Sequence, residues 1–269
     1  NIISHPTLVN IYEFGQLDDG TAYFIMEYIE GETLHHALRK LHGLPMDAMR
    51  SMQILRQIAS GLAAAHAKVI VHRDLKPTNI MLVNDADLRG GERVKLLDFG
   101  IAKFLDGPVR KTTVGMILGT PLYMSPEQCE GSEDLDAKVD VYALGVMLYE
   151  MTTGTVPFMA DNELLVLHLH QSEAPRPPRE QRHELSPAYE SVILRALAKA
   201  PADRFQTAEE MREAANTVRE AGFEPFMAAA IADKQQWVAD QAKAGVLAGV
   251  PKGAPWQAYA DALLAARKP

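Results

Sequence analysis

Residues 72–79 read His-Arg-Asp-Leu-Lys-Pro-Thr-Asn, and Asp98 follows them after two short apolar runs. A loose phosphoryl-transfer transition state needs an aligned nucleophile and groups that hold its spreading negative charge. Asp74 could accept the proton of an incoming hydroxyl, and Lys76 could lie against the transferring phosphoryl group. Asn79 and Asp98 are oxygen ligands of the kind that Mg²⁺ prefers. The pattern therefore predicts magnesium-assisted phosphoryl transfer.

These eight consecutive residues, with Asp-Phe-Gly at 98–100, resemble the catalytic and metal-binding loops of protein kinases. The resemblance implies ATP and Mg²⁺ as cofactors, Asp74 as the catalytic base and Lys76 as the phosphate-stabilising cation. A lysine two residues after the aspartate resembles serine/threonine kinases rather than tyrosine kinases. The family pattern also assigns Asn79 and Asp98 as metal ligands and His72, Phe99 and Gly100 as structural residues that orient the two loops.

Residues 119–127 resemble the end of a kinase activation segment. The resemblance places Thr120 beside the catalytic aspartate, where it shapes the site for a substrate hydroxyl. In the family Glu127 pairs with a distant arginine, which corresponds here to Arg204, and Asp140 anchors the backbone of the catalytic loop. Two unrelated surface charges are the alternative explanation for Glu127 and Arg204.

Arg73 suggests a regulatory role, because an arginine at this position can pair with a phosphate on the activation segment. Thr112 and Thr113 lie in a polar stretch and are the candidate phosphorylation sites. An unmodified, solvated loop is the alternative.

Residues 26–31 (Met-Glu-Tyr-Ile-Glu-Gly) resemble the kinase hinge that receives adenine. The resemblance implies that backbone groups of Glu27 and Ile29 hydrogen-bond the ring edge. It also implies that Met26 limits the depth of the pocket and that Met81 forms part of its floor. Ordinary core packing is the alternative for both methionines.

Two hairpins are expected from turn signals between apolar runs. The first joins residues 8–14 and 22–28 through Asp-Asp-Gly at 18–20, and the second joins 79–83 and 93–97 around a Gly-Gly pair. These hairpins must position the hinge and the predicted metal ligands.

Helices are expected wherever apolar residues recur at helical spacing. This spacing occurs at residues 34–41 and 47–67 and through most of the chain after residue 136, with loops expected at the prolines of 175–178 and at Pro201. The expected fold class is therefore α+β and kinase-like, a mostly helical large lobe with the remnant of a β small lobe.

The resemblance implies a small-lobe remnant and hinge at 1–30 and a large lobe at 31–220. The alanine-rich residues 221–269 fall outside the resemblance, and a helical extension is favoured there over a linker to another module. The chain has no G-x-G-x-x-G motif, and it starts at Asn1 within a sequence that has the pattern of a β-strand. We therefore expect a fragment of a longer kinase that is weakly active or inactive by itself.

The resemblance implies protein substrates and ATP as partners, and composition argues against other classes. The net charge of −8, from 27 basic and 35 acidic side chains, argues against a nucleic-acid surface. The single cysteine, Cys129, fits a reducing compartment, so a cytoplasmic protein is expected. No run approaches the ~20 apolar residues of a membrane span. The oligomeric state is left open.

The main function predicted is a serine/threonine protein kinase that transfers the γ-phosphoryl group of ATP to protein hydroxyls. The alternative from another class is a pseudokinase-like scaffold or binding module without a functional small lobe. The presence of all four residues Asp74, Lys76, Asn79 and Asp98 argues against that alternative. A small-molecule kinase is a third option, and the 119–127 segment favours a protein substrate over it.

Overall fold

A computed structural model describes residues 3–88, 90–98 and 121–218 of the chain. The chain divides into two compact units, residues 1–219 and 220–269, and the described elements all belong to the first. Of the site residues predicted above, Phe99, Gly100, Thr112, Thr113 and Thr120 lie outside the described residues, as does the proposed C-terminal extension.

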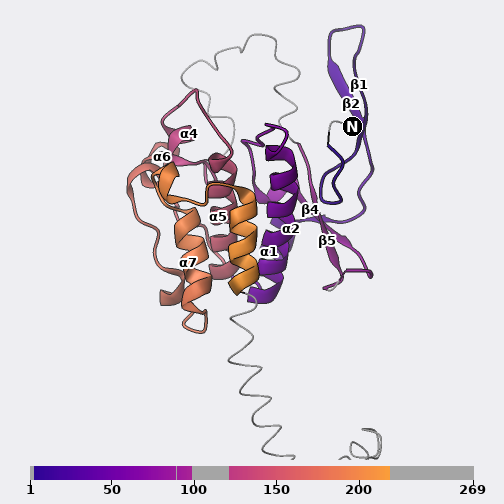
Figure 1. Cartoon of the computed structure of the whole chain (residues 1–269). Coiled ribbons are helices and arrows are strands. Elements are labelled where there is room, and N and C mark those ends of the chain that lie inside the picture. The colour runs from indigo at the N-terminus through magenta and orange to yellow at the C-terminus, as the bar shows by residue number, and fades with distance from the viewer. Residues whose placement is uncertain (1–2, 89, 99–120, 219–269) are drawn as a thin grey trace, which may run out of the picture. The chain divides into compact units, whose positions relative to one another are not determined.

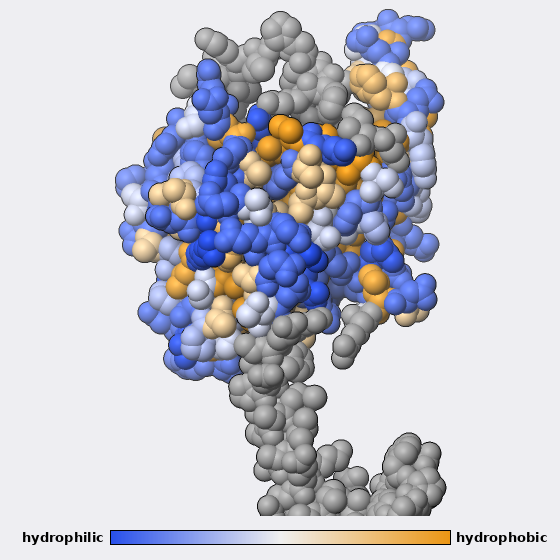
Figure 2. Space-filling view, in the orientation of Figure 1, coloured by the Kyte–Doolittle hydropathy of each residue, from blue (hydrophilic) through white to orange (hydrophobic). Residues whose placement is uncertain are grey.

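The first predicted hairpin is confirmed. Strands β1 (Ile11–Gln16) and β2 (Ala22–Met26) pair antiparallel, with Phe14 opposite Phe24. Gly20 closes the turn with a φ of 85°, which a glycine adopts without steric cost. Apolar side chains on this hairpin remain exposed, and Figure 2 shows hydrophobic surface there among hydrophilic residues. Strand β1 begins and ends later than the predicted run of 8–14, and β2 ends before the predicted residue 28.

The second hairpin, which carries the predicted metal ligands, is also confirmed. Strands β4 (Ile80–Asn84) and β5 (Glu92–Leu96) pair antiparallel, and β3 (Glu32–Thr33) adds to the β4 edge. The side chain of Gln57 donates to the Glu92 carbonyl (3.1 Å) and accepts from the Val94 amide (3.0 Å). This side chain fixes the hairpin on the long helix that precedes it.

Helices make up most of the remainder, as predicted (Figure 1). Their bounds are α1 (Leu34–Lys40), α2 (Ala48–His66), α4 (Pro126–Cys129), α5 (Lys138–Thr153), α6 (Glu163–Ser172), α7 (Pro187–Ala196) and a last described helix at 208–218. At two of the predicted loops the structure has single 3₁₀ turns instead, η2 (Pro178–Glu180) and η3 (Pro201–Asp203). Proline at the first position of each turn presets the backbone angle that helical turns need.

Helix α5 is the centre of the helical core. It packs between α2 and α7, and nearly all of its side chains are buried. A helix that is apolar on all sides is stable only when other elements surround it. Gly145 allows α7 to approach α5 closely, because a Cβ atom at this position would lie 2.7 Å from the Cβ of Ala196 on α7. None of the helices in the described ranges is long and apolar enough to cross a membrane.

We predict that Val69→Gly stabilises the protein. Val69 follows the end of α2 with a φ of 60°, a left-handed conformation that is costly for a β-branched residue, and its side chain is 90% exposed. Glycine should relieve this strain and raise the free energy of unfolding by about 1 kcal/mol. Urea denaturation of both proteins measures the difference. Val69→Ala keeps a Cβ atom, so it should recover clearly less, and equal stability of all three proteins would contradict the prediction.

Candidate active site

The predicted catalytic loop is anchored by Asp140, a buried carboxylate in the first turn of α5. Its oxygens accept hydrogen bonds from the backbone amides of His72 (2.9 Å) and Arg73 (2.8 Å). His66, at the end of α2, places Nε2 2.7 Å from the same carboxylate. These three contacts compensate for the burial of the carboxylate and fix the backbone of the loop.

The two predicted loops each contain a non-glycine residue with a left-handed backbone. Arg73 has a φ of 65° and Asp98 a φ of 54°. Such residues persist where their surroundings hold them. The Arg73 carbonyl accepts from the side chain of Gln128 (2.7 Å), and its guanidinium donates to the Leu135 carbonyl (3.2 Å). The catalytic loop is therefore clamped by α4 as well as by α5.

Asp74 and Lys76 lie together in the site. Lys76 Nζ donates to Asp74 Oδ2 over 2.7 Å, and the Asp74 side chain is 67% exposed. The Asp74 backbone carbonyl accepts from the side-chain amide of Asn79 (2.9 Å). The carboxylate is thus accessible to a substrate hydroxyl, while its backbone is fixed from within.

Asn79 and Asp98 are brought close by a backbone hydrogen bond from Leu97 to the Asn79 carbonyl (2.9 Å). His72 supports the same arrangement, since its Nε2 lies 2.9 Å from the Leu97 carbonyl. The Asn79 amide nitrogen is used by the catalytic loop, and its amide oxygen is the group suited to a metal ion. In the described part of the chain, no three His, Cys, Asp or Glu side chains gather into a metal site. The residues fit an ion that keeps waters and takes phosphate oxygens, as Mg²⁺ does.

A cavity of about 360 Å³ opens beside Asp74 and Lys76. Its walls come from the catalytic loop, from helices α1, α4 and α5, and from the predicted end of the activation segment. Its lining residues are His35, 73–78, 122–124, Gln128, Val139, Asp140 and Ala143. We call this the substrate cavity.

Tyr123 fixes one wall of the substrate cavity. Its hydroxyl donates to Glu150 of α5 over 2.7 Å. Burial raises the pKa of the Glu150 carboxyl, and the Tyr123 hydrogen bond opposes that rise. The next residues form α4, which Ser125 caps with a capping box shared with Gln128.

Glu127 and Arg204 form a bidentate ion pair of 2.7 and 2.8 Å. The Arg204 side chain is fully buried, and its remaining N–H groups donate to the backbone carbonyls of Lys138, Ala198 and Lys199. All five guanidinium donors therefore have acceptors. The pair joins α4 to the start of α5 and to the segment after α7.

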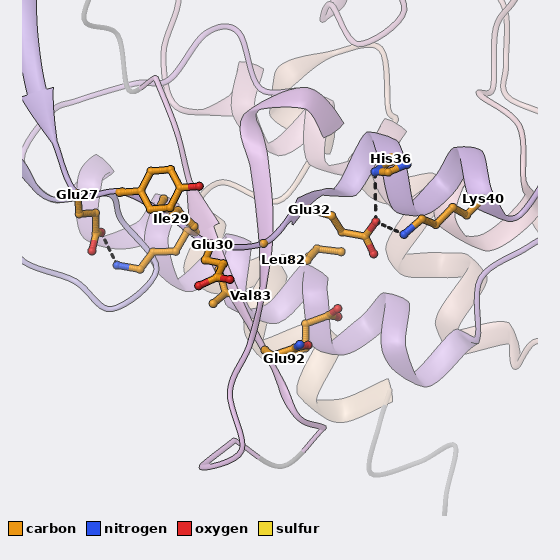
Figure 3. A pocket seen from close by; sticks show the side chains of 13 residues that line it. Glu27, Ile29, Glu30, Glu32, His36, Lys40, Leu82, Val83 and Glu92 are labelled. Carbon is orange, nitrogen blue, oxygen red and sulfur yellow. Dashed lines mark hydrogen bonds and ion pairs between the residues drawn. The ribbon is translucent and has the colours of Figure 1, made fainter.

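The hinge borders a second, larger cavity of about 750 Å³, shown in Figure 3. Glu27 and Ile29 line it, whereas Met26 and Met81 do not. Lys95 of β5 donates to the Glu27 carboxylate (2.5 Å), which also accepts from the Asn10 amide (2.9 Å). Burial opposes ionisation of Glu27, but these hydrogen bonds outweigh it and lower the pKa of its carboxyl.

Residues with structural roles at the site that were not predicted from the sequence include His66, Gln128 and Lys95. The Tyr123–Glu150 pair is another example. Gln128 stands next to the predicted Ser-Pro-Glu turn, and its position three residues after a serine is a capping-box signal. Nothing local to His66 or Lys95 indicates a partner, since each contacts a residue far away in the sequence.

The sequence model of the family described as "Protein kinase domain" matches residues 1–215. The chain belongs to the protein kinase family. This kinase is 44% identical over 216 residues to the serine/threonine-protein kinase pkn3 of Myxococcus xanthus, covering 77% of this chain and 38% of that protein. It is 37% identical over 213 residues to the serine/threonine-protein kinase PknB of Mycobacterium leprae (strain TN), covering 78% and 33%.

The kinase-like fold is confirmed by solved structures. The crystal structure of the Mycobacterium tuberculosis PknI kinase domain matches with a TM-score of 0.61 and 26% identity, over 80% of this chain and 73% of that one. This kinase spans about a third of the length of the curated relatives it matches. Protein kinases as a family use ATP and a divalent metal ion.

We predict that Cys129, at the end of α4, is unreactive in the folded kinase. Burial, with the nearby charge of Glu127, raises the pKa of the thiol to about 12. Because the thiolate is the nucleophile, alkylation by iodoacetamide at pH 8 should be at least about 100-fold slower in the native protein than in urea. Mass spectrometry of the alkylated peptide measures both rates. Equal rates would contradict this prediction.

Proposed function

We propose that this chain transfers the γ-phosphoryl group of ATP to serine and threonine hydroxyls of proteins. The observation that carries the proposal is the accessible Asp74 carboxylate, held by Lys76 at 2.7 Å at the wall of the substrate cavity. Its loop is anchored on the buried Asp140. A rigid loop with an exposed carboxylate meets the positional demand of phosphoryl transfer.

Each predicted site residue has a role in this proposal. Asp74 orients the substrate hydroxyl and accepts its proton, and Lys76 lies against the transferring phosphoryl group. Asn79 and Asp98 hold Mg²⁺, which neutralises charge on the phosphates when bound. Thr120 helps to shape the site for the hydroxyl.

We propose that the hinge receives adenine through backbone groups of Glu27 and Ile29. The Glu27 amide donates to the Asn10 carbonyl within the hairpin (2.9 Å), so its own carbonyl is the group offered to the ring. Met26 and Met81 remain candidates for the depth and the floor of the adenine pocket, although neither lines the cavity of about 750 Å³ at the hinge.

We also propose the regulatory and regional roles expected from the sequence. Arg73, at the wall of the substrate cavity, is the candidate partner for a phosphate on Thr112 or Thr113. Residues 1–30 act as small-lobe remnant and hinge, 31–220 as the large lobe and 221–269 as an extension. The use of ATP and the single cysteine favour a cytoplasmic location.

The experiment is incubation of the purified full-length protein with γ-labelled ATP, a dephosphorylated casein preparation and Mg²⁺. We expect phosphoserine and phosphothreonine but no phosphotyrosine, loss of transfer after chelation with EDTA, and recovery on addition of Mg²⁺. ATP binding without any transfer would instead favour the scaffold function. Phosphate on a small molecule alone would favour the small-molecule kinase.

A further inference from the structure

Helix α1 borders both cavities, and its exposed side chains form two stripes. His36 and Lys40 form one stripe and line the hinge cavity. His35 and Arg39 form the other, and His35 lines the substrate cavity. The two residues of each stripe are four positions apart, so they lie on one face of the helix. We call the second pair the His35–Arg39 stripe.

The two stripes differ in their partners. The carboxylate of Glu32 lies 2.6 Å from Lys40 Nζ and 3.4 Å from His36 Nδ1, as Figure 3 shows. The side chains of His35 and Arg39 are exposed, and neither makes a hydrogen bond or an ion pair with another residue in the described part of the chain. Arg39 leans toward His35, because side chains on a helix point back toward its N-terminus. The stripe therefore offers an unpaired positive charge beside the substrate cavity.

The carboxylates in the described lining of the substrate cavity already have partners. Asp74 accepts from Lys76 Nζ (2.7 Å), and the fully buried Asp140 accepts from backbone amides of the catalytic loop. A basic substrate side chain would find no free carboxylate in this lining, whereas an acidic one would meet the donors of the His35–Arg39 stripe. An imidazole can donate a hydrogen bond in either protonation state, and a guanidinium can bind a carboxylate through two parallel N–H groups.

The spacing along α1 sets which substrate residues can reach the stripe. The helix rises 1.5 Å per residue, so Arg39 lies about 6 Å farther along its axis than His35. An extended peptide advances about 3.3 Å per residue, so this distance corresponds to about two residues. Asp74 and His35 line the same cavity, and the turn η1 (Pro77–Asn79) at the end of the catalytic loop packs against α1. A peptide whose hydroxyl lies at Asp74 therefore reaches the stripe with residues only a few positions away from that hydroxyl.

We propose that the His35–Arg39 stripe selects protein substrates that carry an acidic side chain a few residues from the phosphorylated hydroxyl. The carboxylate of that side chain accepts hydrogen bonds from the Arg39 guanidinium and from the His35 ring, which lines the substrate cavity. The proposal rests on the proposed kinase function, because it names the substrates of that same site. Neither residue of the stripe lines the hinge cavity, so ATP binding should not depend on them.

The test uses three synthetic peptides of equal length, each with one threonine. The second, third and fourth residues on both sides of the threonine are all glutamate, all glutamine or all lysine, and alanine fills the other positions. With the purified full-length protein, kcat/KM should be about fivefold higher for the glutamate peptide than for the glutamine peptide, through KM, and lowest for the lysine peptide. Arg39→Glu should reverse this order, with KM for ATP within about twofold of wild type.

Lys68→Glu is the matched control. Lys68 is also an exposed cation whose side chain has no partner among the described residues, and it lines neither cavity. The variant makes the same change in net charge, so it should keep the order of peptides found in the wild type. His35→Ala should reduce the preference for the glutamate peptide about twofold, and His35→Gln, which keeps a hydrogen-bond donor, should retain more of it.

A binding measurement separates this proposal from the kinase function. Fluorescence anisotropy with labelled peptides should give the same order of affinities in the wild type and in Asp74→Asn, whose phosphoryl transfer is impaired. Equal kcat/KM for the three peptides in the wild type, an unchanged order in Arg39→Glu, or a reversed order in Lys68→Glu overturns the proposal. A wild-type protein that phosphorylates none of the peptides, yet binds the glutamate peptide most tightly and loses that order in Arg39→Glu, refutes the kinase function alone.

Discussion

Asp74→Asn should lower the rate of phosphoryl transfer by about 10²–10⁴-fold, because the amide cannot accept the proton of the substrate hydroxyl. The free energy of unfolding should change little. The Asp74 side chain is largely exposed, and the contacts that fix its loop run through backbone groups and Asp140. Single-turnover transfer from labelled ATP, with urea denaturation alongside, measures both quantities.

The chain offers a closely matched control for this variant. Asp136 and Lys138 have the same spacing as Asp74 and Lys76, form an ion pair, and leave the aspartate side chain 59% exposed. Asp136 lies outside the lining of the substrate cavity, so Asp136→Asn should leave transfer unchanged. If Asp74→Asn and the wild type incorporated equal phosphate, the activity would belong to another site.

Arg204→Met should lower the free energy of unfolding by about 3–5 kcal/mol. The substitution leaves the Glu127 carboxylate without its bidentate partner and three backbone carbonyls without their donor. For a domain of this size the melting temperature should fall by about 10 °C. Calorimetry and chemical denaturation give the two values independently.

An exposed ion pair provides the comparison. Arg176 and Glu180 lie 2.9 Å apart with more than half of each side chain exposed, so Arg176→Met should cost less than about 1 kcal/mol. Adding Glu127→Leu to Arg204→Met should recover part of the loss, because no unpaired charge remains buried. Similar costs for Arg204→Met and Arg176→Met would show that burial of the Glu127–Arg204 pair does not matter.

The candidate catalytic residues and most elements could be predicted because their signals are local. Asp74, Lys76 and Asn79 stand on one loop of consecutive residues, and the two hairpins follow from turn residues between apolar runs. Strand β3 was not predicted, because a strand of two residues is too short to show an alternating pattern. The two 3₁₀ turns η2 and η3 were predicted as loops, because proline is common both in loops and at the first position of a helical turn.

The sequence by itself determined the family, the order of the elements and the residues offered for phosphoryl transfer, since residue type and short-range spacing encode each of these. Only the tertiary structure decided which distant groups meet: Lys95 with Glu27, His66 with Asp140, and Tyr142 with His170. It also showed that neither Met26 nor Met81 lines the cavity at the hinge. A polar residue within a buried helix has the same local pattern whatever its partner, because packing between helices, and not periodicity along one helix, selects the contact.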